Sequence, residues 1–471
     1  MNINKTVSLV KSSFVQTIKK GKDVIIWHSL FGFPKIISLE AQKFLDLFTT
    51  PKTLQFLNRE YELSVADKRF IKEMMVAYYL IPKDFDERNF LEKKNKLLEK
   101  DITNGLFIKN LGLIMAEVCN FRCVYCIHFN NLGISRRISN AKKIMSFKTA
   151  RRAVDEYFEI LGRKQSAGSK KKEVAKINFG GGEPLLNWPV IKKVLKYCQL
   201  NYGNKFVFDF SINTNASLFS SEIIRTLKRH NVSIASSLDG LHEGNDSVRL
   251  TRSGQGTFDL IVQGFDSLAK ENYPINGFSF TVNEKNFEFL NKAIIDWASE
   301  RKMREIRIDI DVIGMVNIPV KDIVMRLMMI RQYAKRKNIE VFGFWSRPAE
   351  NLNKSTISNH VAFCGAVAGS SMCVNPSEEI YTCGYSTTQI GTLKAIDAFC
   401  ASGGQYYGFV QDHLTGRTKR CEGCIIEGAC GGGCNITCEF TRAFNTYKVE
   451  RMCEFYRGAT RELLLEQLRE I

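Results

Sequence analysis

The sequence predicts an α/β protein built on a central parallel sheet. Between residues 106 and 345, six short apolar runs alternate with six segments of helical periodicity, which is the pattern of repeated β/α units. The preceding 105 residues mix strand-like and helix-like segments and contain no cysteine, whereas residues 346–471 are rich in Cys and Gly. We therefore expect three regions, 1–105, 106–345 and 346–471, with the sheet either doubly wound or curled into a barrel.

The first region predicts a small α+β unit of winged-helix character. Ser38 is placed to cap a helix, and Ser64 with Asp67 resembles a capping box that opens another. The expected elements are a strand at Val24–Trp27, helices at Ser38–Phe48 and Ser64–Tyr78, a strand at Tyr79–Ile81 and a charged helical linker at 84–100.

The second region supplies the repeated units. The six expected strands are Leu111–Met115, Ala175–Phe179, Phe206–Ile212, Val232–Leu238, Phe278–Val282 and Ile306–Ile313. The expected helices are Phe147–Leu161, Val190–Gln199, Ser221–Arg229, Phe258–Ala269, Phe287–Ser299 and Val320–Lys335. The basic stretch Gly162–Lys176 predicts a solvated loop. In the third region, little apolar periodicity precedes a final helix at Arg457–Arg469, so we expect a weak core that needs metal to hold its shape.

The composition indicates a globular protein with a strong positive charge. Of its 471 residues, 44% are hydrophobic and 25% charged, which excludes disordered and fibrous classes. The net charge of +18 favours an acidic partner such as nucleic acid, anionic lipid or an acidic peptide. No apolar run reaches the roughly 18 residues of a membrane span, and residues 1–23 lack the apolar core of a signal peptide. We expect a cytoplasmic protein with no membrane partner.

The fourteen cysteines indicate metal or redox chemistry, because a reducing compartment offers them no disulfides. Cys119, Cys123 and Cys126 directly follow the first expected strand of the β/α series. Structural zinc takes four ligands, whereas a [4Fe–4S] cluster held by three thiolates keeps one iron open to a substrate or cofactor.

This three-cysteine motif and the Gly-rich segment that follows resemble the radical S-adenosylmethionine (SAM) superfamily. The resemblance implies a partial (β/α)6 TIM barrel in which SAM chelates the open iron. One electron from the cluster then cleaves SAM to a 5′-deoxyadenosyl radical, which abstracts hydrogen. An external donor such as flavodoxin or ferredoxin would supply that electron.

Further positions match the family at the ends of successive strands, where α/β folds place ligands. Phe179–Pro184 resembles the GGEP motif, Ser237–Gly240 followed by Asp246 and Arg249 resembles SLDG…D-x-x-R, and 213–215 is a weaker match because Ala216 stands where Gly is usual. The resemblance implies that SAM is contacted by Tyr125, Gly181, Gly182, Glu183, Ser237 and Arg249.

The C-terminal cysteines form a second dense pattern. By spacing alone, Cys421-x2-Cys424-x5-Cys430-x3-Cys434 is compatible with a pair of zinc sites. Behind a radical SAM core it resembles the SPASM domain, which holds two auxiliary [4Fe–4S] clusters, although Glu378 stands where that pattern has Gly. The implied total is three [4Fe–4S] clusters.

The resemblance assigns cysteines to each auxiliary cluster. The first set comprises Cys364, Cys373, Cys383 and Cys434; the second comprises Cys421, Cys424, Cys430 and Cys453. Cys438 is an alternative to Cys373, and an open iron in the first cluster is another. Cys198 and Cys400 are expected to be plain buried thiols.

The N-terminal unit resembles the PqqD-like RiPP recognition elements, which bind the leader of a ribosomal precursor peptide by strand addition. The alternative is a regulatory or DNA-binding winged helix, but no basic recognition helix with base-reading spacing is evident, so nucleic acid is the less favoured partner. Sulfatase-maturating enzymes are disfavoured, because Gly384 stands where they carry an Asp after the cysteine that matches Cys383, and because about 105 residues precede the three-cysteine motif.

The resemblances together imply a radical SAM peptide maturase that oxidatively cross-links a precursor peptide through a thioether, C–C or C–O bond. Redox-neutral epimerisation, sulfatase-maturating-type oxidation and a small-molecule substrate are alternatives, and a zinc-containing winged-helix adaptor on nucleic acid is the non-enzymatic one. No catalytic base or hydrogen donor is assigned. His128, His242, Asp309 and Asp311 lie near the expected rim, but packing, capping or salt-bridge roles are expected for them.

Overall fold

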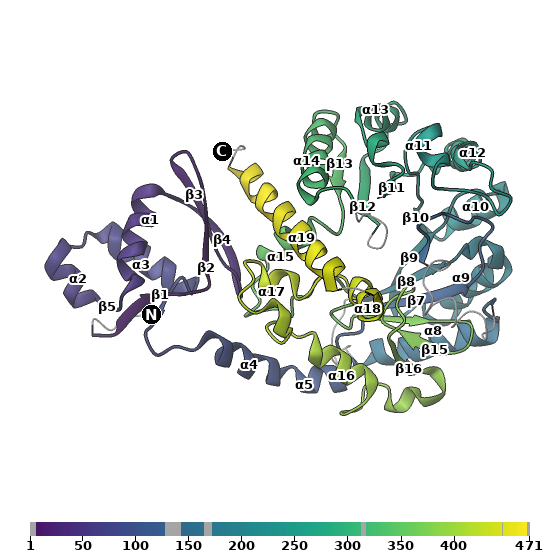
Figure 1. Ribbon diagram of the computed structural model, residues 1–471. Coiled ribbons are helices and arrows are strands. Elements are labelled where there is room, and N and C mark those ends of the chain that lie inside the picture. Colours follow the sequence, from purple (N-terminus) through teal and green to yellow (C-terminus); the bar gives the residue numbers. More distant parts are fainter. Residues whose placement is uncertain (1–5, 128–142, 164–171, 312–316, 445, 469–471) are drawn as a thin grey trace.

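The computed structural model describes residues 6–127, 143–163, 172–311, 317–444 and 446–468. In Figure 1 the N-terminal unit lies to one side, the α/β region lies opposite, and the C-terminal helices lie between the two. None of the helices in the described ranges is long and apolar enough to cross a membrane.

Parallel strands form the centre of the α/β region. One sheet contains the order β10-β9-β8-β7, and a second contains β11-β12-β13. A parallel bridge between Ser237 and Ser279 connects the two sheets. The strands are β7 (Asn110–Ala116), β8 (Glu173–Gly181), β9 (Phe206–Asn213), β10 (Ser233–Ala235), β11 (Gly277–Val282), β12 (Glu305–Ile310) and β13 (Glu340–Phe342). The arrangement is a curved arc of strands in chain order, with helices on its outer side (Figure 1).

The helices begin close to their predicted positions because their capping residues are local in sequence. Ser146 and Ser220, for example, accept hydrogen bonds from Thr149 N and Ile223 N. The helices are α8 (Phe147–Gly162), α9 (Trp188–Tyr202), α10 (Ser221–Arg229), α11 (His242–Asp246), α12 (Phe258–Lys270), α13 (Lys292–Glu300) and α14 (Val320–Arg336).

Two expectations for this region are corrected. The helix predicted at Phe287–Ser299 is divided into a 3-10 turn at Phe287–Phe289 and α13, because Asn291 caps α13 by accepting from Ala293 N. The basic stretch predicted as a loop through Lys176 ends earlier, because β8 begins at Glu173.

The N-terminal unit has two small antiparallel sheets. Their orders are β5-β1-β6 and β2-β3-β4. The strands are β1 (Ser8–Lys11), β2 (Val15–Lys20), β3 (Asp23–His28), β4 (Gly32–Ser38), β5 (Lys52–Thr53) and β6 (Leu80–Pro82); the helices are α1 (Leu39–Asp46), α2 (Leu54–Tyr61) and α3 (Val65–Val76). Ser38 caps α1, and Ser64 with Asp67 forms the predicted capping box of α3. The sequence did not predict β1, β2, β4, β5 or α2.

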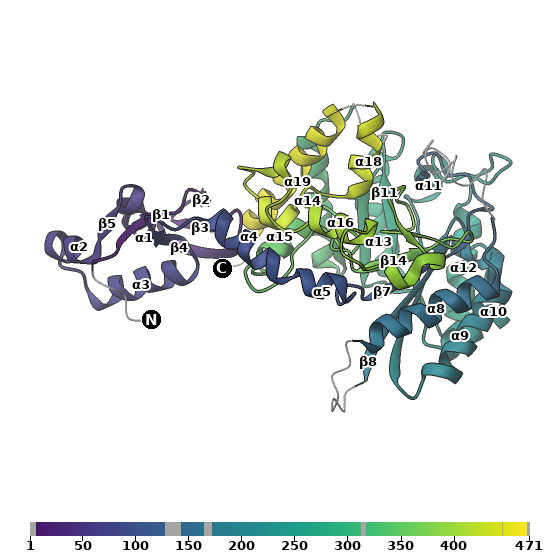
Figure 2. The same cartoon turned by 90° about the horizontal axis from the view of Figure 1, so that it is seen from below.

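The charged linker contains α4 (Glu87–Leu97) and α5 (Glu99–Thr103), which lead to β7 along the lower edge of Figure 1. Figure 2 shows the same two helices from below, between the N-terminal unit and the α/β region.

The C-terminal region has a better core than the sequence predicts. The final helix, α19, begins at Thr446 rather than Arg457, and its Phe455, Ala459 and Leu464 are buried in the core shared with the barrel strands. The other elements are α15 (Arg347–Leu352), β14 (Ser371–Val374), β15 (Glu379–Tyr381), β16 (Gln389–Thr392), α16 (Gln405–Asp412), α17 (Glu427–Cys430) and α18 (Asn435–Phe444). Because β14 pairs in parallel with β7, the regions interlock, and the boundaries at 105/106 and 345/346 stay predictions.

Candidate active site

The three-cysteine loop follows β7 and lies along the segment 248–251. Arg122 N donates to Leu250 O at 2.7 Å, and Val124 N donates to Val248 O at 2.9 Å. Burial, the largest cause, raises the pKa of Cys119 to about 11 and that of Cys123 to about 12, and the nearby charge of Cys126 adds to both. The fold therefore brings the three thiols within electrostatic reach of one another. In the part of the chain that the structure describes, no three His, Cys, Asp or Glu side chains converge closely enough for a single metal ion.

The glycines of the GGEP segment let its backbone run against the three-cysteine loop. Gly182 N donates to Ala116 O at 2.7 Å, and Glu183 N donates to Val118 O at 3.0 Å. A Cβ on Gly181, whose φ is +120°, would lie 2.3 Å from Ala116 O; a Cβ on Gly182 would lie 2.4 Å from Val118 O. The space that a side chain would need here is thus filled by the chain's own backbone.

Glu183 is fully buried and joins the ends of β8 and β9. Its Oε1 accepts from Leu185 N at 3.0 Å and from Thr214 Oγ1 at 2.8 Å, and its Oε2 accepts from Asn215 N at 2.8 Å. Burial raises the pKa of Glu183 to about 7, against the lowering effect of these three donors. The Thr and Asn that follow β9 thereby become part of the site.

The next residue, Ala216, has φ +64°, which is the left-handed region that favours Gly. Ala216, which stands where the family pattern has Gly, therefore keeps the backbone conformation of a glycine. Asn215 Nδ2 donates to Asn120 Oδ1 at 2.8 Å, which connects this turn to the three-cysteine loop.

Tyr125, Asp239 and Arg249 form a triad in which the last two are buried and Tyr125 is half-buried. Arg249 Nε donates to Asp239 Oδ2 at 2.7 Å, and the Tyr125 hydroxyl donates to the same oxygen. Arg249 Nη1 lies 3.9 Å from Cys123 Sγ, and its guanidinium carbon lies 5.6 Å from the centroid of the Tyr125 ring. The positive charge of Arg249 lowers the pKa of Cys123, opposing the larger effect of burial. Asp239, which the sequence analysis quoted without a role, is the residue that joins Tyr125 to Arg249.

Two other members of the same motif have different surroundings. Asp246 Oδ1 accepts from the backbone N–H groups of Thr257 and Phe258, both at 2.8 Å, so it supports the start of α12. Ser237 forms the bridge to Ser279, and the buried hydroxyl of its neighbour Ser236 has no hydrogen-bond partner among the described residues. This unpaired hydroxyl marks a polar position at the end of β10.

The first predicted auxiliary set is brought together around Cys383. Burial raises the pKa of this thiol well above its ordinary value, and the charges of Cys373, Cys434 and Cys364 add to the effect. A Cβ on Gly112 would lie 2.6 Å from Cys373 Sγ, so this glycine in β7 leaves room for the sulfur. Glu378 has φ +68°, which explains why a glycine is usual at that position.

The second predicted set surrounds Cys430. Its pKa is raised by burial and then by Cys421, Cys453 and Cys424. Cys438 lies between the two sets: it accepts from Arg420 Nη2 at 2.6 Å and donates to Cys434 O at 3.7 Å. Cys198 and Cys400 are buried, as expected.

Neither Tyr385 nor Arg307 was predicted from the sequence to lie at the site. Although 40% of its surface is exposed, desolvation raises the pKa of Tyr385 to about 12, with contributions from Cys126 and Cys383. Tyr385 therefore lies near both the three-cysteine loop and the first auxiliary set. Its only sequence signal is its place two residues after Cys383.

The remaining rim residues have mostly structural partners. Asp309 pairs with Arg307 at 2.6 Å, as the expected salt-bridge role implies, and Asp311 N donates to Val282 O at 2.7 Å. His242 lies 3.4 Å from both Asp246 and Asp259 on the surface, whereas His128 lies outside the described residues.

Comparisons with known proteins identify radical SAM relatives of this chain. Residues 113–291 match the model of the radical SAM superfamily. The chain is 25% identical to radical SAM cyclopropyl synthase TigE from Paramaledivibacter caminithermalis over 468 residues, which cover 97% of this chain and 96% of that protein.

Two solved structures share the fold. Native anSMEcpe with bound AdoMet matches 77% of this chain and 100% of its own, with a TM-score of 0.59 and 17% identity. SuiB from Streptococcus suis, bound to precursor peptide SuiA, matches 92% of this chain and 97% of its own, with a TM-score of 0.52 and 14% identity.

Proposed function

We propose that this chain, which carries a radical SAM domain and is a radical SAM enzyme, modifies a ribosomally made precursor peptide by net two-electron oxidation. The observation that carries the proposal is the coexistence of three sites in one fold. The three-cysteine loop contacts Glu183 and Arg249, and each of two further sets of four cysteines is brought together elsewhere in the fold. The relative that spans nearly the whole chain is itself named as a radical SAM synthase.

The described residues fit the cofactors that this chemistry needs. Cys119, Cys123 and Cys126 would hold one [4Fe–4S] cluster and leave an iron open to SAM. Residues at the ends of β7, β8 and β10 would contact SAM; they are Tyr125, Gly181, Gly182, Glu183, Ser237 and Arg249. When bound, cluster and SAM together supply a 5′-deoxyadenosyl radical that abstracts hydrogen.

The protein's own groups would prepare this site in two ways. Asp239 holds the Arg249 guanidinium beside Cys123, and the positive charge of Arg249 opposes the burial that raises the pKa of this thiol; a metal ligand requires the thiolate form. Glu183 fixes Thr214 and Asn215 through hydrogen bonds, so the rim is shaped before any ligand enters.

The second and third cysteine sets would hold two auxiliary [4Fe–4S] clusters. The first would use Cys364, Cys373, Cys383 and Cys434, and the second Cys421, Cys424, Cys430 and Cys453. Their role would be to accept the second electron of the oxidation. A flavodoxin or ferredoxin would supply the first electron.

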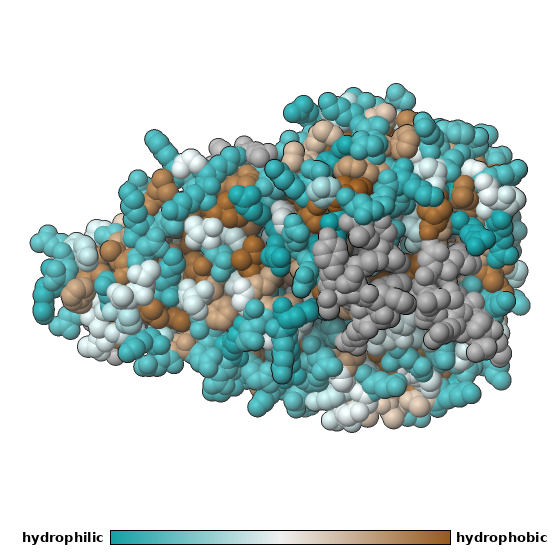
Figure 3. All heavy atoms as spheres, in the orientation of Figure 1, coloured by the Kyte–Doolittle hydropathy of each residue, from teal (hydrophilic) through white to brown (hydrophobic). Residues whose placement is uncertain are grey.

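The surface of the N-terminal unit would suit the binding of a peptide. Exposed apolar residues interrupt its hydrophilic surface (Figure 3); they include Ile36, Phe56, Tyr61, Val65 and Val76. Basic Lys68, Arg69 and Lys72 are also exposed on α3. An acidic leader peptide with apolar anchors would suit both features, and the structure of SuiB with SuiA is an example of a peptide bound to a protein of this fold.

A new C–C bond within the peptide is the favoured product. The name of the TigE relative specifies a cyclopropyl group, and closing a three-carbon ring removes two hydrogens and forms one C–C bond. Forming a thioether or C–O cross-link likewise removes two hydrogens and forms one bond. Epimerisation, the redox-neutral alternative, leaves the mass unchanged.

The test is the intact mass of a candidate precursor peptide co-expressed anaerobically with the enzyme. A loss of about two mass units, absent with the Cys119/Cys123/Cys126 triple Ala variant, is the expected result. Fragmentation then separates a change within one residue from a link between two. An unchanged mass with deuterium uptake from solvent would instead establish epimerisation, and an unmodified peptide with no deuterium uptake would contradict the proposal for that peptide.

A further inference from the structure

The turn between β3 and β4 contacts the loop between Cys424 and Cys430. Trp27 Nε1 donates to Ile425 O at 2.7 Å, and Gly428 N donates to Ser29 O at 2.8 Å. A Cβ on Gly428 would lie 2.0 Å from Leu30 O, so the two backbones meet where no side chain fits. The N-terminal unit therefore touches the very segment that joins two cysteines of the second auxiliary set.

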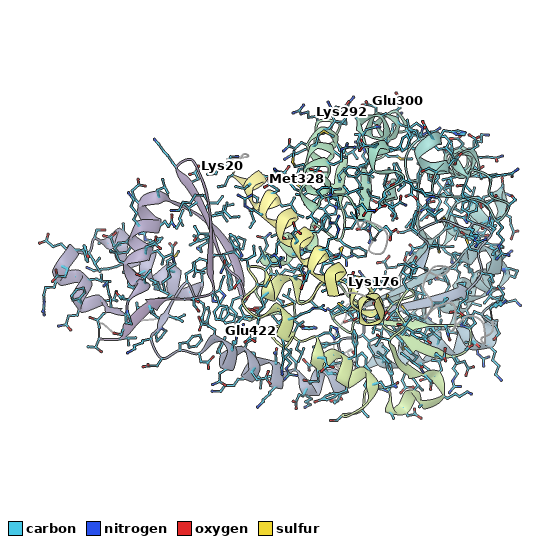
Figure 4. All side chains as sticks on the ribbon, viewed as in Figure 1. Lys20, Lys176, Lys292, Glu300, Met328 and Glu422 are labelled. Carbon is cyan, nitrogen blue, oxygen red and sulfur yellow. The ribbon has the colours of Figure 1, made fainter. Side chains whose placement is uncertain are left out.

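An ion pair between the half-buried Arg88 of α4 and the buried Glu427 fixes the same loop. Arg88 donates to both carboxylate oxygens of Glu427, at 2.8 and 3.0 Å, and the Glu427 side chain is only 2% exposed. Glu427 Oε2 also accepts a hydrogen bond from Gly423 N at 3.1 Å. The Glu427 side chain therefore connects the residues on the two sides of Cys424. Arg88 Nε lies 3.4 Å from Glu422, which Figure 4 labels where the C-terminal region approaches the linker.

His28 connects the turn to α4. Its Nδ1 accepts from Leu30 N at 3.3 Å and Phe31 N at 3.0 Å, and its ring stacks between Phe14 and Phe31. With Nδ1 accepting, the proton is on Nε2, which lies 3.3 Å from Ser12 Oγ. Ser12 in turn donates to Glu87, the neighbour of Arg88, at 2.7 Å. The β3–β4 turn and α4 are thus joined by one hydrogen-bond network.

We propose that Trp27, Ser29 and Arg88 are positioning residues for the second auxiliary cluster. They hold Cys424 and Cys430 from outside the cysteine-rich region, so the N-terminal unit is a structural part of that site rather than a tethered module. The inference rests on the proposed function in one respect, namely that Cys421, Cys424, Cys430 and Cys453 hold a cluster.

Arg88→Gln in the full-length protein tests this directly, because it leaves the buried Glu427 carboxylate without its cation. After anaerobic reconstitution, wild type should hold about twelve irons per chain and Arg88→Gln about eight, with the electron paramagnetic resonance signal of one auxiliary cluster lost. Arg88→Lys, which keeps the charge, should retain more iron than Arg88→Gln.

The matched control is Arg417→Gln. Arg417 donates two hydrogen bonds, at 2.7 and 3.1 Å, to Glu92, which lies in α4 as Arg88 does. Arg417 itself lies outside the Cys424–Cys430 loop. It should keep about twelve irons per chain. If Arg88→Gln also keeps twelve, or if Arg417→Gln loses as many, the inference is overturned.

A second pair of measurements separates this inference from the proposed function. Cys421→Ala/Cys424→Ala should lower the iron content from about twelve to about eight. If wild type and this variant hold equal iron, the second cluster itself is absent and the proposed function fails at that point. Retained SAM cleavage and an unchanged unfolding transition of the α/β region show that Arg88→Gln has not unfolded the chain.

Discussion

At the scale of single residues, the site depends on two buried carboxylates with different partners. Asp239 is fully buried and receives Arg249, Tyr125 and the backbone N–H of Thr281. Glu183 is equally buried but receives only neutral donors; burial raises the pKa of both carboxyls, that of Glu183 to about 7, and the positive charge of Arg249 opposes this effect at Asp239. The two carboxylates therefore have different roles: Asp239 binds the Arg249 cation, and Glu183 accepts hydrogen bonds from the backbone of Leu185 and Asn215.

Asp239→Asn should destabilise the protein strongly, because it leaves Arg249 buried without a counter-charge. Breaking such a pair costs about 3–5 kcal/mol. Chemical unfolding at neutral pH measures the loss. Asp266→Asn is the control, since its pair with Arg301 has the same 2.7 Å distance but is exposed, and should change stability by about 0–1 kcal/mol. Equal losses would show that burial is not what makes the Asp239 pair important.

His28 predicts a pH dependence of stability. Burial lowers the pKa of His28 from 6.5 to about 3, so between these values the unfolded chain binds the proton and the folded chain does not. Its contribution is fully present above about pH 6.5 and is lost as the pH falls towards 3, by at most about 1.4 kcal/mol per pH unit. His28→Gln should flatten this slope in unfolding experiments between pH 7 and 4, and an unchanged slope would contradict the prediction.

At the scale of elements, close backbone approaches decide which cysteines meet. β14 pairs with β7 in a register that sets Cys373 opposite Gly112, and only a glycine leaves space there for the sulfur. The early start of α19 places Cys453 inside a helix, where it reaches Cys421 and Cys424. Cys438 is instead paired with Arg420.

Cys373→Ser should therefore lose iron from the first auxiliary cluster, whereas Cys438→Ser should keep it. Iron and sulfide analysis after anaerobic reconstitution, with electron paramagnetic resonance, distinguishes the two variants. Gly112→Ala should resemble Cys373→Ser, because the added methyl would lie 2.6 Å from Cys373 Sγ. The reverse order of iron loss would assign Cys438 as the fourth ligand.

At the scale of the whole molecule, the net charge of +18 and the position of the N-terminal unit both bear on substrate binding. The unit is anchored on the second cysteine set through α4 and the β3–β4 turn, while α3 with its exposed basic residues lies apart from that joint. Deleting residues 1–105 would therefore remove cluster support together with peptide recognition, so point changes are the better test.

Charge reversal of Lys68, Arg69 and Lys72 to Glu should weaken binding of an acidic leader peptide at least tenfold, or about 1.4 kcal/mol. The dependence of the Kd on salt concentration should fall as well, because fewer charges take part. The control reverses Lys196, Lys270 and Lys321, which are exposed on the helices of the α/β region. It changes the net charge equally, so an equal loss of affinity would mean that only long-range attraction matters.

Local patterns in the sequence determined much of the fold. These patterns depend only on neighbouring residues: they are the six apolar runs, the caps at Ser38 and Ser64 and the three-cysteine spacing. The structure has strands, helices and capping hydrogen bonds at or near the predicted positions. β1, β2 and β4 were missed because most of their residues are only partly buried, so their apolar patterns are weaker than that of β3. α19 was predicted too short because apolar periodicity is weak before Arg457.

Only the tertiary structure decided how these pieces act on one another. Three kinds of contact join residues 10 to 398 positions apart: the pairing of Asp239 with Arg249 and Tyr125, the proximity of Tyr385 to Cys126, and the support of the Cys424–Cys430 loop by Trp27 and Arg88. Spacing cannot predict such contacts, because they depend on how strands and helices pack once each has formed. Sequence thus determined which chemical groups the chain carries, and packing determined which of them meet.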